Sequence, residues 1–190
     1  MDDLCIDFVN SRFNDHRGTG SVYDRMPLPG WWSWLVERWD LGPCPPPGGV
    51  ELAELRGLRT RARRLLEGGG LPSAGDRRAL DRILSAAPVT WQVSREPGSA
   101  ELWLRPLASG VPQVLASIVV SLMEVLSGEG SRVRRCANPQ CTFLFRDTSR
   151  SGTRRWCDPG ICGNLVKVRA FRAGRAGTRP VRRTAQGIVR

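Results

Sequence analysis

Histidine and lysine are almost absent from this 190-residue chain, and no apolar run in it is long enough to cross a membrane. A membrane-spanning helix needs roughly 18 apolar residues in a row, whereas the longest candidate, residues 111–126, carries several polar side chains. The one histidine, His16, lies in a polar segment, which is typical of a solvated side chain. A glycine-rich phosphate-binding loop and a nucleophile elbow are also missing. These absences predict a protein that is not an enzyme and does not enter a membrane.

An export signal is missing as well, because the first residues are acidic rather than basic. We therefore expect a cytoplasmic protein whose six cysteines stay reduced. In that compartment, closely spaced cysteines indicate metal or redox chemistry rather than a disulfide framework.

Acidic residues are scarce in the last third of the chain. Residues 131–190 contain 15 lysine and arginine side chains but two acids, a net charge of +13, whereas residues 1–130 have 14 arginines and 16 acids, a net charge of −2. Only Lys167 is a lysine, but GC-rich coding produces the same bias and no function follows from it. The charge asymmetry divides the chain into an N-terminal domain (1–130), a small second domain (131–173) and a flexible basic tail (174–190).

Apolar residues recur with a helical period through most of the N-terminal domain, in segments 31–39, 52–66, 73–84 and 111–126. The second of these segments also carries four arginines that we expect on a solvated face, namely Arg56, Arg59, Arg63 and Arg64. Apolar residues alternate in 89–93 and 102–104, which predicts a β-hairpin, while residues 4–10 fit either a helix or a strand. The expected fold class is mainly α: a multihelical N-terminal domain with one small β-hairpin, followed by a small four-cysteine domain that ends in a basic helix.

Tryptophans are concentrated in residues 31–39, which contain four of the seven. The helical spacing of Trp32, Leu35 and Trp39 favours a helix that faces the core. In an alternative interpretation, the N-terminal domain binds a small molecule in a pocket lined by tryptophans, the candidates being Trp31, Trp34, Trp91 and Trp103.

Four of the cysteines form two matching pairs, Cys136 with Cys141 and Cys157 with Cys162, each separated by four residues. Each pair encloses turn-forming residues, so the backbone can fold back and aim both sulfurs at one point. Four thiolates make a closed tetrahedral shell, which suits one structural Zn²⁺ ion. Two disulfides, four unrelated buried thiols and an iron–sulfur cluster are the alternatives.

Around these cysteines, the sequence predicts a strand over 142–145, a returning strand over 154–156 and a helix over 165–172. On that helix we expect Leu165, Val168 and Phe171 to face inward and Lys167, Arg169 and Arg172 to face outward.

A net charge of +13 on about 60 residues is expected to attract a polyanion through counterion release. We expect the partner to be double-stranded DNA. The candidates for contacts to base edges are Asn164, Lys167, Arg169 and Arg172, and those for phosphates are Arg150, Arg154 and Arg155. The tail would add phosphate contacts; alternatively, its charge serves only solubility.

The cysteine segment resembles the CGNR zinc finger, through residues 135–141, 145–149, 155–157 and 162–164. Residues 4–11 resemble the start of the ABATE domain, which precedes this finger in bacterial proteins described as predicted stress-induced transcription regulators. The resemblance implies a mainly helical N-terminal domain, a zinc site at Cys136, Cys141, Cys157 and Cys162, and DNA binding. The fourth position of the signature is Leu165 here, not arginine, so an arginine contact made in relatives is lost or moved to Lys167 or Arg169.

The resulting hypothesis is a transcription regulator whose N-terminal domain receives a signal, as from a small-molecule effector, or forms a homodimer. Two other classes remain open: a zinc-stabilised protein-interaction module, and a small-molecule-binding domain with the finger as its scaffold.

Overall fold

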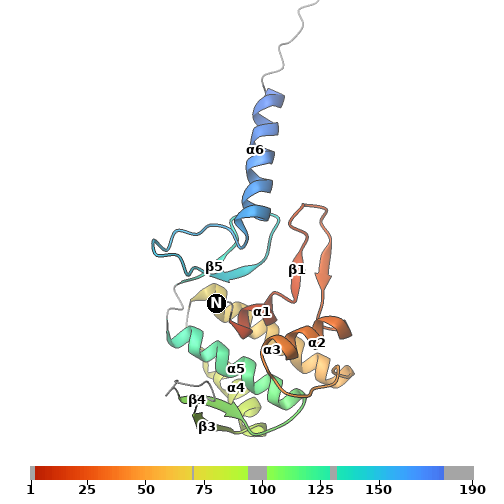
Figure 1. Ribbon diagram of the computed structural model, residues 1–190, viewed down its shortest axis with the longest axis vertical. Coiled ribbons are helices and arrows are strands. Elements are labelled where there is room, and N and C mark those ends of the chain that lie inside the picture. The colour runs from red at the N-terminus through yellow and green to blue at the C-terminus, as the bar shows by residue number, and fades with distance from the viewer. Residues whose placement is uncertain (1–2, 70, 94–101, 129–131, 178–190) are drawn as a thin grey trace, which may run out of the picture.

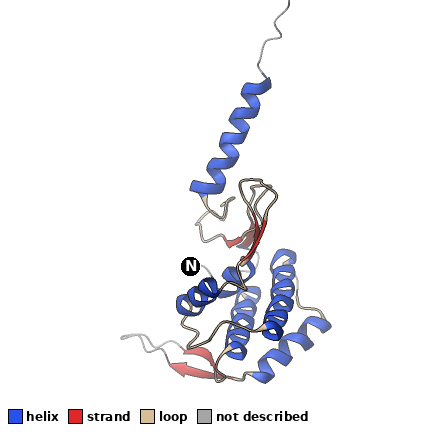
Figure 2. Ribbon diagram, turned by 90° about the vertical axis from the view of Figure 1, so that its right-hand side faces the viewer, coloured by secondary structure: helices blue, strands red, loops and turns tan. Residues whose placement is uncertain are grey.

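A helical body carries a small cysteine-rich domain, from which one long helix projects (Figures 1 and 2). The computed structural model describes residues 3–69, 71–93, 102–128 and 132–177. The helices are α1 (Leu4–Val9), α2 (Pro29–Arg38), α3 (Gly49–Gly68), α4 (Ala74–Ala86), α5 (Val111–Ser127), the π-helix η2 (Pro159–Gly163) and α6 (Asn164–Gly177). The strands are β1 (Arg12–Asn14), β2 (Val22–Asp24), β3 (Val89–Val93), β4 (Leu102–Pro106), β5 (Val133–Arg135) and β6 (Leu144–Arg146). The mainly α fold class is confirmed.

Helices α1, α3 and α5 pack together at the centre of the body. Helix α1 buries five of its six residues, and a helix this short is unstable alone, so packing against α3 and α5 must hold it. Helix α5 buries Val114, Ile118 and Leu122 on one face, together with several neighbours on adjoining faces. Its apolar sequence therefore reflects a central position in the core.

Tryptophans of α2 contribute to this core, as their spacing predicts. Trp32 is fully buried and donates a hydrogen bond from Nε1 to the Cys44 carbonyl, while Trp39 donates to Asp7 Oδ2 at 3.0 Å. Trp34 and Trp91 are exposed, and the side chain of Trp103 lies outside the described residues. The cavity described below is lined by other residues.

Arg59 of α3 is buried and Arg63 is half-buried, and the expectation of a solvated face was wrong for them. Arg59 is 6% exposed and forms a two-point ion pair with Asp24, at 2.6 and 2.8 Å. Arg63 donates to the carbonyl oxygens of Val9 and Thr142 at 3.0 and 2.9 Å. Both satisfy backbone or acidic groups that arrive from other segments, and the sequence of α3 alone gives no sign of these partners.

Helix α4 begins at the cap residue Ser73, whose hydroxyl accepts a hydrogen bond from the Asp76 amide. The Asp76 carboxylate is buried and accepts hydrogen bonds from Ser73, Arg64 and Arg61. The bond from Ser73, followed by that from Arg64, lowers the pKa of Asp76 well below its ordinary value, although burial opposes the shift.

Acid is expected to remove the stabilisation that Asp76 provides. Because its pKa is lower in the folded chain, its contribution is fully present above the unfolded pKa of about 3.9 and declines as the pH falls below that value. Urea unfolding at pH 7 and pH 3 measures this effect. Asp76→Asn should destabilise the chain at pH 7 and flatten the pH dependence. An equally steep acid loss in that variant would contradict the role of Asp76.

Strands β1 and β2 form an antiparallel hairpin that the sequence did not predict, with Phe13 opposite Tyr23. The Phe13 ring stacks on Tyr23 at 5.3 Å and contacts Phe143 of the cysteine-rich domain at 5.1 Å, measured between centroids. The hairpin extends from the body toward that domain (Figure 1). The predicted hairpin is also present, as β3 paired with β4.

The cysteine-rich domain is joined to the body by buried contacts. Leu144 of β6 is 2% exposed and belongs to the central core. The side chain of Asn10 exchanges two hydrogen bonds with the Leu144 backbone, donating to its carbonyl at 2.8 Å and accepting from its amide at 2.9 Å. Strand β6 pairs with β5. Residues 154–156, which were predicted to form its returning partner strand, form no strand, so that prediction was wrong.

Helix α6 runs to Gly177, beyond the predicted end at residue 172, so residues 174–177 of the expected flexible tail are helical. The remainder of the predicted tail, 178–190, lies outside the described residues. In the part of the chain that the structure describes, we found no helix with the length and apolar character to span a membrane.

Candidate metal centre

The four paired cysteines meet at one point between β5, β6 and the start of α6. Their sulfur atoms all lie within 4.8 Å of one another. Cys157 Sγ is 3.8 Å from Cys141 Sγ and 3.7 Å from Cys162 Sγ. In a tetrahedral zinc site with bonds of 2.3 Å, neighbouring sulfurs are about 3.8 Å apart. The donor set and its spacing therefore fit one structural zinc ion.

The electrostatics of the four thiols also favour a cation. The hydrogen bond from Cys157 lowers the pKa of the Cys141 thiol to about 6. The same contact with Cys141 raises the pKa of Cys157, and burial raises that of Cys162 to about 11. One thiolate thus opposes ionisation of its neighbours, and a divalent cation at the centre removes that repulsion.

Backbone turns aim the sulfurs at the centre, as the turn-forming residues between the paired cysteines predict. In the first pair, the Cys141 amide donates to the Asn138 carbonyl at 2.9 Å. In the second, Asp158 caps η2 by accepting from the Ile161 amide at 2.9 Å. Gly163 lies so close to the Trp156 ring that a Cβ there would come within 3.1 Å of it. This close contact between Gly163 and the Trp156 ring fixes where α6 begins relative to the metal centre.

Asn138 links the metal centre to the β1–β2 hairpin and to helix α6. Its side chain is fully buried; Nδ2 donates to Cys162 Sγ at 3.6 Å and to the His16 carbonyl at 3.0 Å. Its Oδ1 accepts from Arg169 of α6 at 3.2 Å. The turn pattern between Cys136 and Cys141 gives no sign of these partners.

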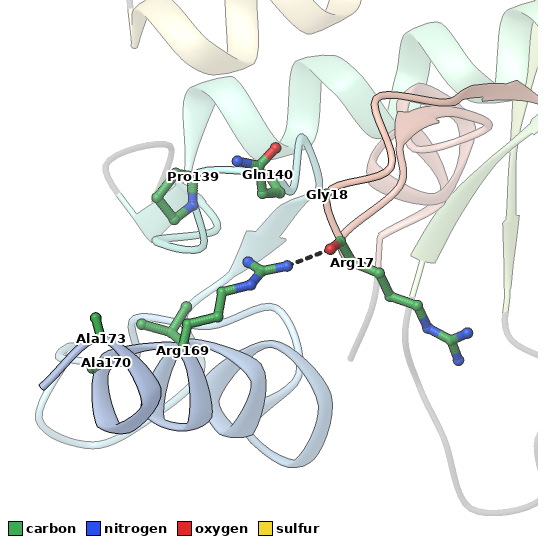
Figure 3. Close-up of a pocket in the computed structure, with 8 residues that line it drawn as sticks. Arg17, Gly18, Pro139, Gln140, Arg169, Ala170 and Ala173 are labelled. Carbon is green, nitrogen blue, oxygen red and sulfur yellow. Dashed lines mark hydrogen bonds between the residues drawn. The ribbon is translucent and has the colours of Figure 1, made fainter. Parts of the chain in front are cut away.

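Arg169 completes this link, and its predicted outward orientation was wrong. Its guanidinium donates to the carbonyls of His16 and Arg17 in the β1–β2 hairpin, at 3.3 and 2.6 Å. Figure 3 shows the side chain crossing from α6 to the hairpin tip. Gly18, at φ +86, lies against this guanidinium, where a Cβ would come within 3.3 Å of it. Arg169 therefore anchors the base of α6 to the N-terminal domain.

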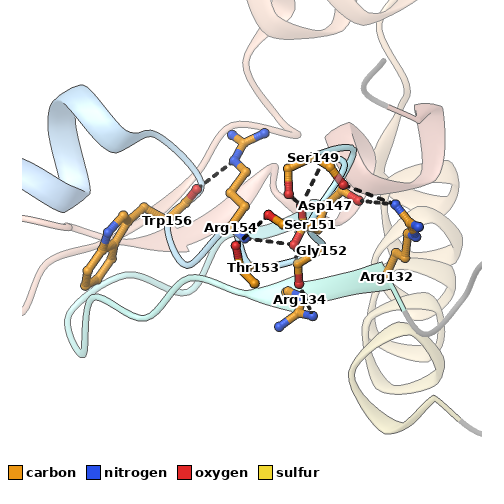
Figure 4. Close-up of polar contacts among 9 residues, drawn as sticks. All are labelled: Arg132, Arg134, Asp147, Ser149, Ser151, Gly152, Thr153, Arg154 and Trp156. Carbon is orange, nitrogen blue, oxygen red and sulfur yellow. Dashed lines mark hydrogen bonds and ion pairs between the residues drawn. The ribbon is translucent and has the colours of Figure 1, made fainter.

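The loop after β6 is organised by Asp147, whose side chain is fully buried (Figure 4). One oxygen accepts from the amide and hydroxyl of Ser149, and the other accepts from the Arg154 amide at 2.9 Å. The Arg154 side chain donates to the carbonyls of Trp156 and Cys157 and stacks over Phe145. Arg154 thus stabilises the loop that delivers Cys157, whereas the sequence suggested a phosphate contact.

The other predicted nucleic-acid residues lie on the surface, namely Arg150, Arg155, Asn164, Lys167 and Arg172. Val168 and Phe171, which were expected to face inward, are 37% and 63% exposed. Helix α6 projects from the molecule instead of packing on the body (Figure 2), so these apolar residues have no core to enter. Leu165 is half-buried.

Comparison with family models found two matches. The model described as "Putative stress-induced transcription regulator" (ABATE) matches residues 2–129, and the "CGNR zinc finger" model matches residues 132–175. The chain belongs to the ABATE family. A comparison with curated proteins found no match. The finger of this ABATE protein keeps Cys162, Gly163 and Asn164 of its signature and carries Leu165 at the last position.

Proposed function

We propose that this ABATE protein is a zinc-dependent transcription regulator whose helix α6 binds double-stranded DNA. One observation carries the proposal: an exposed basic helix begins directly at the metal centre and projects away from the rest of the molecule (Figure 1). A helix in this position is free to enter a major groove, which is wide enough to admit one.

The exposed side of α6 has the composition that such a contact needs. At 100° per residue, one side of the helix, an arc of about 140°, holds Asn164, Lys167, Val168, Phe171 and Arg172. Lysine and arginine pair with guanine, asparagine pairs with adenine, and apolar groups contact the thymine methyl. The opposite side holds Arg169, which is already bonded to the hairpin.

Arg150 and Arg155 would supply phosphate contacts beside this helix. Arg155 stacks over the Trp156 ring, which in turn lies against Gly163 at the start of α6. Arg150 is exposed on the loop that Asp147 organises. Arg154 and Arg169 leave the proposed interface because their guanidinium groups already bond to backbone carbonyls.

Charge removal on α6 should weaken DNA binding. Lys167→Gln and Arg172→Gln are each expected to lower affinity for a duplex about tenfold, because each removes a contact worth about 1–3 kcal/mol. If the lost contact is to a phosphate, the slope of log affinity against log salt should fall by about 1. Fluorescence anisotropy of the zinc-loaded full chain, on duplexes selected from a random pool, measures both quantities.

Arg78→Gln is the matched control, since it removes the same charge from an exposed position on α4. It should leave the affinity and the slope close to those of the unchanged chain. If the Lys167 and Arg172 variants bind as tightly as this control, α6 does not contact DNA. Tight, salt-insensitive binding of a protein partner instead would favour the interaction-module hypothesis.

The finer parts of the proposal follow from the family and the sequence. An ABATE domain next to a zinc finger supports a sensing or dimerising role for residues 1–130. Within the described residues all six cysteines are free, which agrees with the reducing cytoplasm expected for this protein.

A further inference from the structure

A cavity of about 320 Å³ lies where the N-terminal domain meets the zinc finger. Its walls come from β1, from α3 and from the segments that flank the first two zinc ligands. The charged and hydrogen-bonding side chains that line it include Arg12, Arg59, Arg63, Glu67, Arg135 and Thr142. Small-molecule sites are usually about 300–1,000 Å³, so the cavity suits a small ligand.

Four of these residues are arginines, and two of the arginines have no acidic neighbour to neutralise them. Arg59 is paired with Asp24, and Arg63 with Glu67 at 3.1 Å. Arg12 and Arg135 are exposed, and within the described part of the chain neither forms an ion pair. The cavity therefore keeps a charge of about +2.

The guanidinium groups of the cavity are also close enough to repel one another. Burial lowers the pKa of Arg63, and the charges of Arg135 and Arg59 lower it further, while Glu67 acts in the opposite direction. An anion in the cavity would relieve this repulsion. It would also bring Arg12 of the N-terminal domain and Arg135 of the finger onto one ligand.

The cavity also contains a neutral hydrogen-bond donor, the Thr142 hydroxyl. The Thr142 hydroxyl accepts a hydrogen bond from the Asn14 amide at 2.9 Å, so its own proton remains available to a ligand. Guanidinium groups bind phosphate through two parallel hydrogen bonds. A phosphate group carries between about −1.5 and −2 charges at pH 7, which matches the uncompensated pair of arginines.

We infer that this cavity is a binding site for a phosphate dianion, held by Arg12 and Arg135 across the junction of the two domains. The site lies outside the metal centre and does not depend on DNA binding by α6. We expect the phosphate to be the terminal monoester of a small phosphorylated molecule, because a nucleic-acid backbone phosphodiester carries one charge and matches the pair of arginines less well.

Calorimetric titration of the zinc-loaded full chain with inorganic phosphate tests the site. The ionic strength is held constant, and acetate is titrated in parallel as a monoanion. Phosphate should bind, acetate should bind at least tenfold more weakly, and Arg12→Gln and Arg135→Gln should each weaken phosphate binding about tenfold. Arg78→Gln, which removes a charge outside the cavity, should not change it.

The same three variants are then tested for binding to a DNA duplex. If only phosphate binding is lost, the site serves a small phosphorylated molecule. If phosphate competes with the duplex and both are lost together, the site holds a backbone phosphodiester, and the proposal of a dianion site is overturned. Absence of phosphate binding, equal binding of acetate, or equal loss in Arg78→Gln would overturn the proposal. None of these results depends on Lys167 or Arg172, so a failure here is distinct from a failure of α6 to bind DNA.

Discussion

Removal of zinc should unfold the finger and release α6 from its fixed position. Structural zinc contributes on the order of 10 kcal/mol to the folding of such small domains. Among the described residues, the cluster around the sulfur atoms consists of three buried cysteines with Phe143, Trp156 and Cys157 packed against them, which is too little apolar surface to replace the metal. Chelation, or Cys157→Ser, should therefore lower the melting temperature and the helical circular dichroism signal. Elemental analysis should show one zinc per unchanged chain.

Cys44→Ser is the control for this experiment. Cys44 lies in the proline-rich loop before α3, outside the sulfur cluster, and it is a free thiol like the others. The control should keep one zinc per chain and a nearly unchanged melting temperature. A Cys157→Ser chain that retained both would show that the cluster does not stabilise the fold through a metal.

Replacement of Asn10 by leucine should destabilise the N-terminal domain and the finger together. The Asn10 side chain satisfies both the amide and the carbonyl of Leu144, and all of these groups are buried. A buried backbone group left without a partner costs about 1–3 kcal/mol, so Asn10→Leu should lose about 2–6 kcal/mol of unfolding free energy. Urea denaturation followed by fluorescence measures this loss.

Asn10→Asp tests the two hydrogen bonds between Asn10 and Leu144 separately. Aspartate can still accept from the Leu144 amide but faces the Leu144 carbonyl with a second acceptor, so it should also destabilise the chain. Asn14→Leu is the control, because the Asn14 side chain is exposed and only its backbone amide bonds to Thr142. If Asn10→Leu were no worse than Asn14→Leu, the paired bonds would not couple the domains.

The metal site was predicted from sequence because zinc ligation depends on local spacing. Two pairs of cysteines with turn residues between them can reach one ion with little help from the rest of the chain. The long helices were predictable for a similar reason: α3 and α5 carry enough periodic apolar residues to show their type and approximate bounds. The Ser73 cap of α4 is likewise a local signal.

Predictions about single arginines did not anticipate the partners that the fold brings to them. Arg59, Arg154 and Arg169 resemble solvated or nucleic-acid-binding residues because arginine is usually exposed. Their actual partners are Asp24, the carbonyls after Arg154 and the hairpin tip. A guanidinium group carries five donors and can donate hydrogen bonds to whatever carbonyl or carboxylate the fold brings near it.

The sequence by itself determined that this chain is mainly helical and that four thiols near its end hold a zinc ion, because periodicity and cysteine spacing are local properties. Only the tertiary structure decided that the β1–β2 hairpin reaches the finger, that Asn10 and Asn138 join the two domains, and that α6 leaves the body with Val168 and Phe171 exposed. Those features depend on contacts between residues more than 100 positions apart in the chain, or on the direction in which a helix leaves the body. Neither kind of information is carried by the order of residues along one segment.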